Sequence, residues 1–242
     1  MNAMAEAART GATGTAAVRT AAVRTKASGA KSAARPRDAA LTKARLLACA
    51  TDEFAVNGFA GARIEAVVKA AGVNISLLYQ YFGSKEKLFI AVMESAYGLV
   101  RAQHRDLDVR EHAPKEAMES LIRRTFRIFV EHPHIIGLLA SENVHGGRHI
   151  LKSPYIRGLY TPLLETIGSV LQRGAAAGVF RGDVDPLDFF VSMNGIGYFY
   201  LSNRYTLGVI LNREMMTAEA LSRHEEHIVQ VLLGYLRPER GS

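Results

Sequence analysis

Residues 70–88, which read AAGVNISLLYQYFGSKEKL, decide the fold. Gly72 separates two short segments with helical patterns, at about 63–71 and 75–81. A glycine adopts the backbone angles at which one helix ends and the next begins at a steep angle. The Gly-Ser pair at 83–84 then ends the second segment and offers a serine N-cap to a longer helix. The stretch therefore predicts a helix-turn-helix unit followed by a longer helix.

Another helix is expected just upstream of this unit. Asp38 is a plausible N-cap, and the Asn-Gly pair at 57–58 is a common helix end. Between them, apolar residues recur three and four positions apart, as on one helical face: Leu41, Leu46, Leu47, Ala50 and Phe54. Three short helices bury little apolar surface, so we expect this unit to pack against the chain that follows.

The rest of the chain has helical patterns and no competing strand pattern. Asp185-Pro186 and Thr217 are typical helix starts. Helices are expected at about 115–131, 134–144, 154–178, from 186 onward and at 217–236. The predicted fold class is therefore all-α, with an N-terminal three-helix domain and a larger C-terminal helical domain.

The composition is typical of a cytoplasmic helical protein. Of the 242 residues, 48% are hydrophobic, which allows a sizeable core over most of the chain. Cys49 is the only cysteine, which excludes an internal disulfide. Since no run of about 18 apolar residues is present, we expect neither a membrane-spanning helix nor a membrane partner.

Most of the positive charge lies at the N-terminus. Residues 1–37 carry seven Lys and Arg against one Glu, a net charge of +6, whereas the whole chain has +7. The segment lacks the large apolar side chains that would anchor a core, so it is interpreted as a disordered basic arm. An inert extension, a misassigned start and an organellar transit peptide are alternative interpretations.

Three short stretches together resemble the DNA-binding domain of the TetR family. They are Gly58-Phe59, residues 70–74 and residues 78–88, and the resemblance extends over about 41–95. It implies a bacterial homodimer at the nucleoid, in which residues 38–84 form the helix-turn-helix domain and 85–242 the effector-binding and dimerisation domain. The implied function is a transcriptional repressor that a small molecule of unknown identity releases from its double-stranded DNA operator.

The resemblance also implies which residues meet DNA. Gln80 would pair with adenine, Ile75 and Leu77 would offer apolar contacts to bases, and tyrosine and basic side chains would reach phosphate or sugar. The full set is Arg63, Asn74, Ile75, Ser76, Leu77, Tyr79, Gln80, Tyr81 and Lys85. Tyr79 and Tyr81 are alternatively packing residues, and Arg63 and Lys85 are alternatively solvated charges. Arg63 and Ile75 also depart from the residues that are common at these positions in the family.

Effector and dimer contacts are expected in the C-terminal domain. The effector candidates are apolar or polar residues of its middle helices: Leu138, Leu139, Glu142, Phe189, Met193, Asn194 and Tyr198. The resemblance implies that segments 186–204 and 217–236 pair with those of a second copy as a four-helix bundle; alternatively they only fill the core of one protomer. No cofactor is expected. The histidine pairs 132/134 and 145/149 lack a Cys or carboxylate partner, so no metal site is predicted.

Other function classes have less support. The sequence lacks a phosphate-binding loop, a metalloprotease helix and a nucleophile elbow, so an enzyme is not predicted. The alternative is a helical module that senses a ligand or partner without specific DNA recognition. Arg63 and Ile75 are the features that favour it.

Overall fold

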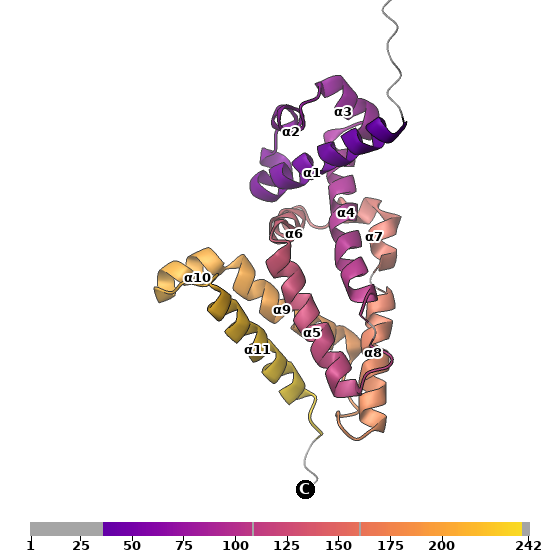
Figure 1. The fold of residues 1–242 in the computed structure, drawn as a ribbon, viewed down its shortest axis with the longest axis vertical. Coiled ribbons are helices and arrows are strands. Elements are labelled where there is room, and N and C mark those ends of the chain that lie inside the picture. Colours follow the sequence, from indigo (N-terminus) through magenta and orange to yellow (C-terminus); the bar gives the residue numbers. More distant parts are fainter. Residues whose placement is uncertain (1–35, 108, 160, 239–242) are drawn as a thin grey trace, which may run out of the picture. The chain divides into compact units, whose positions relative to one another are not determined.

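The computed structural model describes residues 36–107, 109–159 and 161–238 (Figure 1). All regular elements in these ranges are helical, which confirms the predicted all-α class. Almost all of the predicted arm, residues 1–37, lies outside them. No helix in the described ranges combines the length and apolar character that crossing a bilayer would need.

The first three helices form the part of the structure that we call the head. They are α1 (Pro36–Gly61), α2 (Ile64–Ala71) and α3 (Ile75–Phe82). Gly72 ends α2 in the left-handed region, at φ 65° and ψ 37°, and its N–H donates to carbonyls of the last turn. The predicted turn is therefore confirmed.

The boundaries of α1 differ from those expected. The helix begins at Pro36, so Asp38 lies in its first turn and the prediction of Asp38 as N-cap is wrong. Proline suits a first helical position because its fixed φ is already helical and its missing N–H would have had no partner. Gly58 interrupts α1 at φ 64° and ψ 178°, where the helix end was expected, and a further helical turn follows to Gly61.

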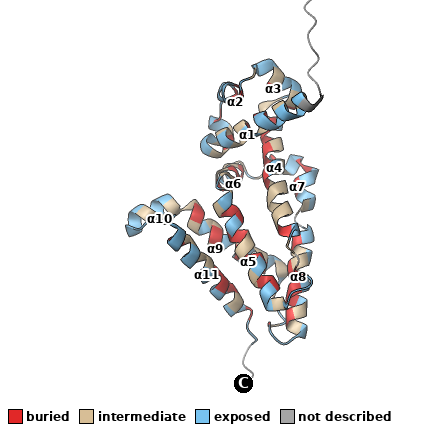
Figure 2. Ribbon diagram, in the orientation of Figure 1, coloured by how far each residue is buried: buried red, intermediate tan, exposed pale blue. Residues whose placement is uncertain are grey.

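Helix α4 (Lys85–Arg105) leads from the head into the rest of the chain, which we call the body. Its N-cap is Ser84 as predicted, since the Ser84 hydroxyl accepts from the Lys87 N–H at 3.1 Å. Buried residues such as Leu88 and Phe89 join the two parts in one hydrophobic core. Figure 2 shows buried positions along α4. The body continues with α5 (Pro114–Glu131), α6 (His134–Val144) and the 3-10 turn η1 (Ile150–Lys152).

One helix predicted for the body is divided in two. Instead of a single helix over 154–178, the chain forms α7 (Pro154–Leu159) and α8 (Thr161–Ala176). Pro162 stands at the second position of α8, where it cannot donate to the preceding turn, so the helix is broken before it. Helices α9 (Pro186–Ser202), α10 (Arg204–Leu211) and α11 (Ala218–Tyr235) complete the body.

The caps of two C-terminal helices are confirmed. The Asp185 carboxylate accepts from two N–H groups in the first turn of α9, and the Thr217 hydroxyl accepts from the Ala220 N–H in the first turn of α11. Helix α10 was not predicted as a separate element. It connects α9 and α11 at one end of the body and leaves several apolar side chains exposed, among them Val209 and Ile210.

Helices α1 and α6 approach each other closely. A Cβ atom added at Gly137 of α6 would lie 2.1 Å from the carbonyl oxygen of Ala55 in α1. The Phe59 N–H, next to the break in α1, donates to the Ser141 hydroxyl of α6 at 2.9 Å. The head is therefore fixed to the body through α6 as well as through α4.

Candidate DNA-binding surface and effector site

Helix α3 has one buried face and one exposed face. Leu78 and Phe82, one turn apart, are buried in the hydrophobic core. On the other side, four residues that share a helical face are exposed: Ile75, Ser76, Tyr79 and Gln80. This exposed surface offers an amide, two hydroxyls and an apolar branch, groups that suit base edges and thymine methyls in the major groove.

The remaining predicted residues of this segment are partly engaged within the head. The Asn74 side chain caps α3 by accepting from the Leu77 N–H at 2.8 Å. Leu77 is half-buried, and Tyr81 is half-buried with its ring 6.5 Å from that of Phe82. Asn74 and Tyr81 therefore have structural roles within the head. The Asn74 amide NH2 and the Tyr81 hydroxyl are not used in these contacts.

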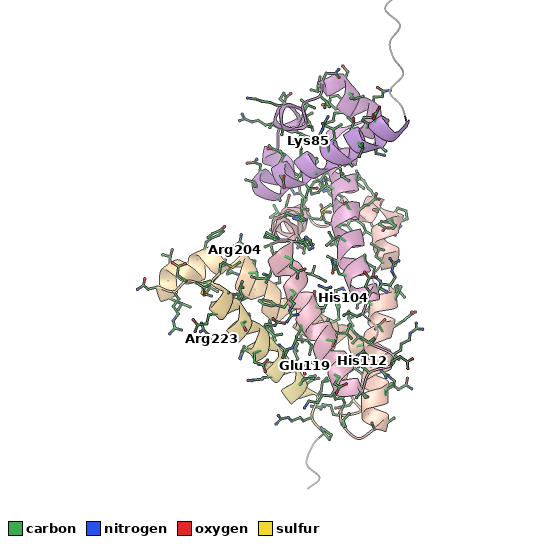
Figure 3. All side chains as sticks on the ribbon, viewed as in Figure 1. Lys85, His104, His112, Glu119, Arg204 and Arg223 are labelled. Atoms are coloured by element: carbon green, nitrogen blue, oxygen red, sulfur yellow. The ribbon has the colours of Figure 1, made fainter. Side chains whose placement is uncertain are left out.

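Arg63 and Lys85 differ in how free their charges are. The backbone N–H of Arg63 donates to a Glu53 carboxylate oxygen, while the side chain of Arg63 is exposed. Lys85 lies beside the head (Figure 3), where its ammonium donates to the Ala62 carbonyl at 2.7 Å. The ammonium also lies 5.2 Å from the centre of the Phe59 ring. Lys85 thus holds the end of α1, a role that the sequence did not reveal.

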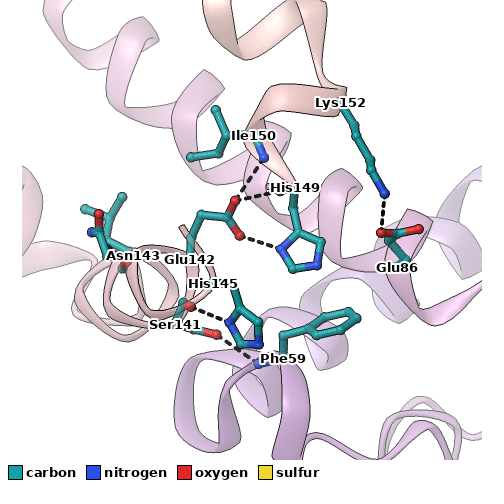
Figure 4. Close-up of polar contacts among 10 residues, drawn as sticks. Phe59, Glu86, Ser141, Glu142, Asn143, His145, His149, Ile150 and Lys152 are labelled. Carbon is teal, nitrogen blue, oxygen red and sulfur yellow. Dashed lines mark hydrogen bonds and ion pairs between the residues drawn. The ribbon is translucent and has the colours of Figure 1, made fainter. Parts of the chain in front are cut away.

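A buried polar pair lies where the head meets the body. Glu142 accepts from the backbone N–H groups of His149 and Ile150 at 2.8 and 3.0 Å, and its second oxygen is 2.6 Å from His149 Nδ1 (Figure 4). The His149 ring lies 4.4 Å from the Phe59 ring and 4.8 Å from the Phe89 ring. The carboxylate of Glu142, predicted as an effector residue, is thus bound by His149 and by the first residue of η1.

The predicted effector residues do not come together as one site. Leu138 and Leu139 line an apolar cavity of about 20 Å³. Phe189, Met193, Asn194 and Tyr198 lie on α9 and are not part of its lining. The Asn194 amide donates to the Phe190 carbonyl, and the Tyr198 ring packs 6.2 Å from that of Phe129.

The other side of this cavity comes from α4, where no effector residue was predicted. Met93, Ala96, Tyr97 and Val100 recur at helical spacing and line the cavity. That spacing was visible in the sequence, but it could not reveal that the face lies opposite α6. Burial, and to a smaller extent the negative charge of Glu142, raises the pKa of Tyr97 to about 12, so its hydroxyl stays neutral.

The histidines are engaged individually. The rings of His145 and His149 lie 5.6 Å apart, but His145 Nδ1 contacts the Ser141 carbonyl and His149 Nδ1 contacts Glu142. Within the described ranges, no three His, Cys, Asp or Glu side chains gather as a set of metal ligands.

Two family profiles and a curated relative match this chain. Residues 46–92 match the family profile described as bacterial regulatory proteins, tetR family, and residues 114–232 match that of the tetracyclin repressor-like C-terminal domain. The HTH-type transcriptional repressor NicS of Pseudomonas putida is 33% identical over 190 residues, which are 78% of this chain and 90% of NicS.

This chain belongs to the TetR family. The predicted function, a helix-turn-helix transcriptional repressor that binds DNA, is confirmed, and the chain is not an enzyme.

Two solved TetR-like structures agree in fold. The transcriptional regulator SCO4942 of Streptomyces coelicolor has a TM-score of 0.63 at 20% identity, over 81% of this chain and 98% of that one. The fatty acid degradation regulator FadR of Bacillus halodurans also has a TM-score of 0.63 at 20% identity, over 81% and 96%. At this identity, the likeness concerns the fold alone.

Proposed function

We propose that this TetR-family repressor binds its operator as a homodimer, with α3 of each protomer in a major groove. An effector bound in the body would release it. The observation that carries the proposal is the exposed face of α3, where Ile75, Ser76, Tyr79 and Gln80 stand opposite a buried apolar face. A second helix-turn-helix doubles the number of DNA contacts and the length of the operator sequence that is recognised. Such a protein would work at the nucleoid, in the cytoplasm of a bacterium.

Within this surface, the proposed roles follow from chemistry. Gln80 would read adenine through a bidentate amide contact, and Ile75 and Leu77 would meet thymine methyls. Ser76, Asn74, Tyr79 and Tyr81 have polar atoms that would reach bases, phosphate or sugar. Arg63 supplies a free guanidinium for phosphate, and Lys85 would add its charge while holding the end of α1.

The dimer would form through α9 and α11. Leu187, Val191 and Phe199 recur four or eight positions apart on α9, and all are exposed. Gly195, in the same series, has open space where a Cβ would be, which allows a partner helix to approach closely. Val231 and Tyr235 extend the exposed apolar face onto α11. An exposed apolar surface on two neighbouring helices supports the four-helix arrangement.

The effector would bind in the body, between α4 and α6. Leu138 and Leu139 supply one side and Tyr97 and Val100 the other, and the site would have to widen to admit a ligand. Glu142 lies next to this region and also ties η1 to α6, so a ligand that displaces α6 would disturb the contact with α1. Phe189, Met193, Asn194 and Tyr198 would form an outer layer from α9.

A titration of the full chain against DNA from its own upstream region tests the DNA-binding proposal. A specific complex whose log–log salt slope indicates several phosphate contacts is expected. Gln80→Ala should relax the preference at one base pair, by about 1–3 kcal/mol of discrimination. Arg63→Gln should weaken all sequences alike and lower the salt slope by about one.

Arg157→Gln serves as the control, since Arg157 is an exposed arginine on α7, outside α3 and outside the proposed dimer helices. It should leave both the affinity and the slope unchanged. Equal losses for Gln80→Ala on preferred and altered sites would contradict base reading by α3.

A further inference from the structure

The end of α4 far from the head forms one wall of an open cleft. The cleft has a volume of about 520 Å³ and lies between α4, α8 and the segment that follows α4. Four arginines and two carboxylates line it, namely Arg101, Arg105, Arg110, Arg173, Asp106 and Glu165. Positive charge is therefore in excess within a space large enough for a small molecule.

One of the four arginines is structural. Arg173 of α8 donates from Nη1 to the carbonyls of Arg110 and His112 at 3.0 Å, and from Nη2 to the Val109 carbonyl at 2.6 Å. These bonds hold the segment after α4 against α8. The cleft thus has a fixed floor, built by the protein's own backbone.

Of the three remaining arginines, Arg110 lies in the segment after α4, and the pair that shares one helix is Arg101 and Arg105. They stand one turn apart on α4, and neither forms an ion pair or hydrogen bond with the residues that the structure describes. Burial, together with the charge of Arg105, lowers the pKa of Arg101, while Glu165 partly opposes this shift. An anion in the cleft would relieve this repulsion.

The face of α4 that carries these arginines becomes apolar toward the head. Tyr97 and Val100 line both the 20 Å³ cavity against α6 and a smaller one of about 10 Å³ against Leu159 and Leu163, and this smaller cavity also touches Arg101. From Met93 to Arg105 this face extends about 18 Å along the helix. It joins a charged opening to an apolar interior.

We propose that the effector is an organic carboxylate with an apolar body. Its carboxylate would bind Arg101 and Arg105 in the cleft, and its apolar part would enter along Tyr97 and Val100. Guanidinium groups suit this ligand because they bind a carboxylate with two parallel hydrogen bonds. This inference rests on the proposed function, since it assigns the chemistry of its effector.

The DNA backbone does not fit as the anion. The 21-residue helix α4 places about 30 Å between its first residue, beside the head, and the cleft at its last turn. Operator DNA bound at α3 would therefore lie far from Arg105.

Calorimetric titration of the full chain tests the proposal with octanoate and benzoate as probes. The uncharged amides octanamide and benzamide serve as matched ligands, and inorganic phosphate serves as an anion without an apolar body. At least one carboxylate should bind at least tenfold more tightly than its amide, and phosphate should bind weakly. The double variant Arg101→Gln/Arg105→Gln should lose at least tenfold in carboxylate affinity, while Arg157→Gln, at an exposed arginine on α7 that does not line the cleft, should bind as the unaltered chain does.

Thermal unfolding of each variant checks that the fold is kept, and operator binding is measured on the same samples. Carboxylate affinity that is equal in the double variant, or equal to that of the amides, would overturn the proposal and show that the arginines serve only the helix end. If the unaltered chain does not bind DNA specifically, this result would instead count against the proposed function. A bound carboxylate that lowers operator affinity only when both arginines are present supports both.

Discussion

At the scale of single residues, His104 is a buried imidazole in the last turn of α4 (Figure 3). Its Nδ1 is 2.9 Å from the Val100 carbonyl and its Nε2 is 2.9 Å from the Thr125 hydroxyl. Burial lowers the pKa of His104, and the charges of Arg101 and Arg124 lower it further, whereas the bond to Val100 opposes the shift. In a neutral ring that donates from Nδ1, Nε2 accepts from the Thr125 hydroxyl, which also has the Leu121 carbonyl within reach at 2.8 Å.

Stability should therefore depend on pH through His104. The unfolded chain, in which histidine has a pKa of about 6.5, takes up the proton before the folded chain does. The contribution of His104 is thus complete above about pH 6.5 and is lost as the pH falls toward the lowered folded value. We expect His104→Gln to flatten the decline in the free energy of unfolding between pH 7 and 5, by at most about 1.4 kcal/mol per pH unit.

Urea unfolding at several pH values and a fixed protomer concentration measures this slope. Burial also lowers the pKa of His134 and His224, so the His104→Gln variant keeps part of the slope, with the same sign. Gln103→Ala, which removes a side chain that does not titrate from the neighbouring position of α4, is the control and should leave the slope as it is. A His104→Gln slope equal to that of the control would refute the assignment.

At the scale of elements, the contact between α1 and α6 is the tightest helix approach at the junction of head and body. Gly137 leaves no room for a side chain, because the Ala55 backbone oxygen occupies that space. Nearby, Ser141 and Glu142 bind the break in α1 and the turn η1, respectively. A displacement of α6 would therefore move α1 as well, because the two helices are in direct contact.

Replacing the glycine should force these helices apart. Gly137→Ala is expected to lower the free energy of unfolding by about 1–3 kcal/mol, since overpacked contacts with backbone cannot be relieved by a side-chain rotation. Urea unfolding measures it. Gly158→Ala on α7 is the matched control, because a Cβ there meets nothing within 4 Å. Equal stabilities of the two variants would mean that α1 and α6 separate freely.

Short sequence signals predicted where several of these helices begin. Ser84, Asp185 and Thr217 each cap the helix that they were expected to cap, because capping depends on the adjacent residues alone. The division before Pro162 also has a local cause, but the apolar pattern on both sides of it is helical and favours a single helix over 154–178. The effector site was not predictable, since it depends on which faces of α4 and α6 meet, and residues far apart in the chain determine that.

At the scale of the whole molecule, the proposed dimer determines whether the two heads reach one operator. The exposed apolar residues of α9 would become its interface, and those of α10 continue that surface at Tyr205 and Val209. A single helix-turn-helix contacts few base pairs, so a monomer would bind DNA weakly.

A charge within the proposed interface should break the dimer. Val191 is 57% exposed at the middle of α9, and Val191→Glu would place a carboxylate against the partner helix. Light scattering after size-exclusion chromatography should then give the mass of a monomer, with at least tenfold weaker operator binding. Val144→Glu, at an exposed position at the end of α6, should remain a dimer. A dimeric Val191→Glu would place the interface elsewhere.

The unbroken course of α4 has a mechanical consequence. The helix carries Ser84 and the head at one end and Arg105 at the other, so it can act as a rigid lever about 30 Å long. A tilt of about 5° about its far end would displace the head by about 2.6 Å. One base-pair step is about 3.4 Å, so movements of this size in two linked heads would put them out of register with successive major grooves. A small rearrangement around Arg101 would then be enough to spoil the fit to the operator.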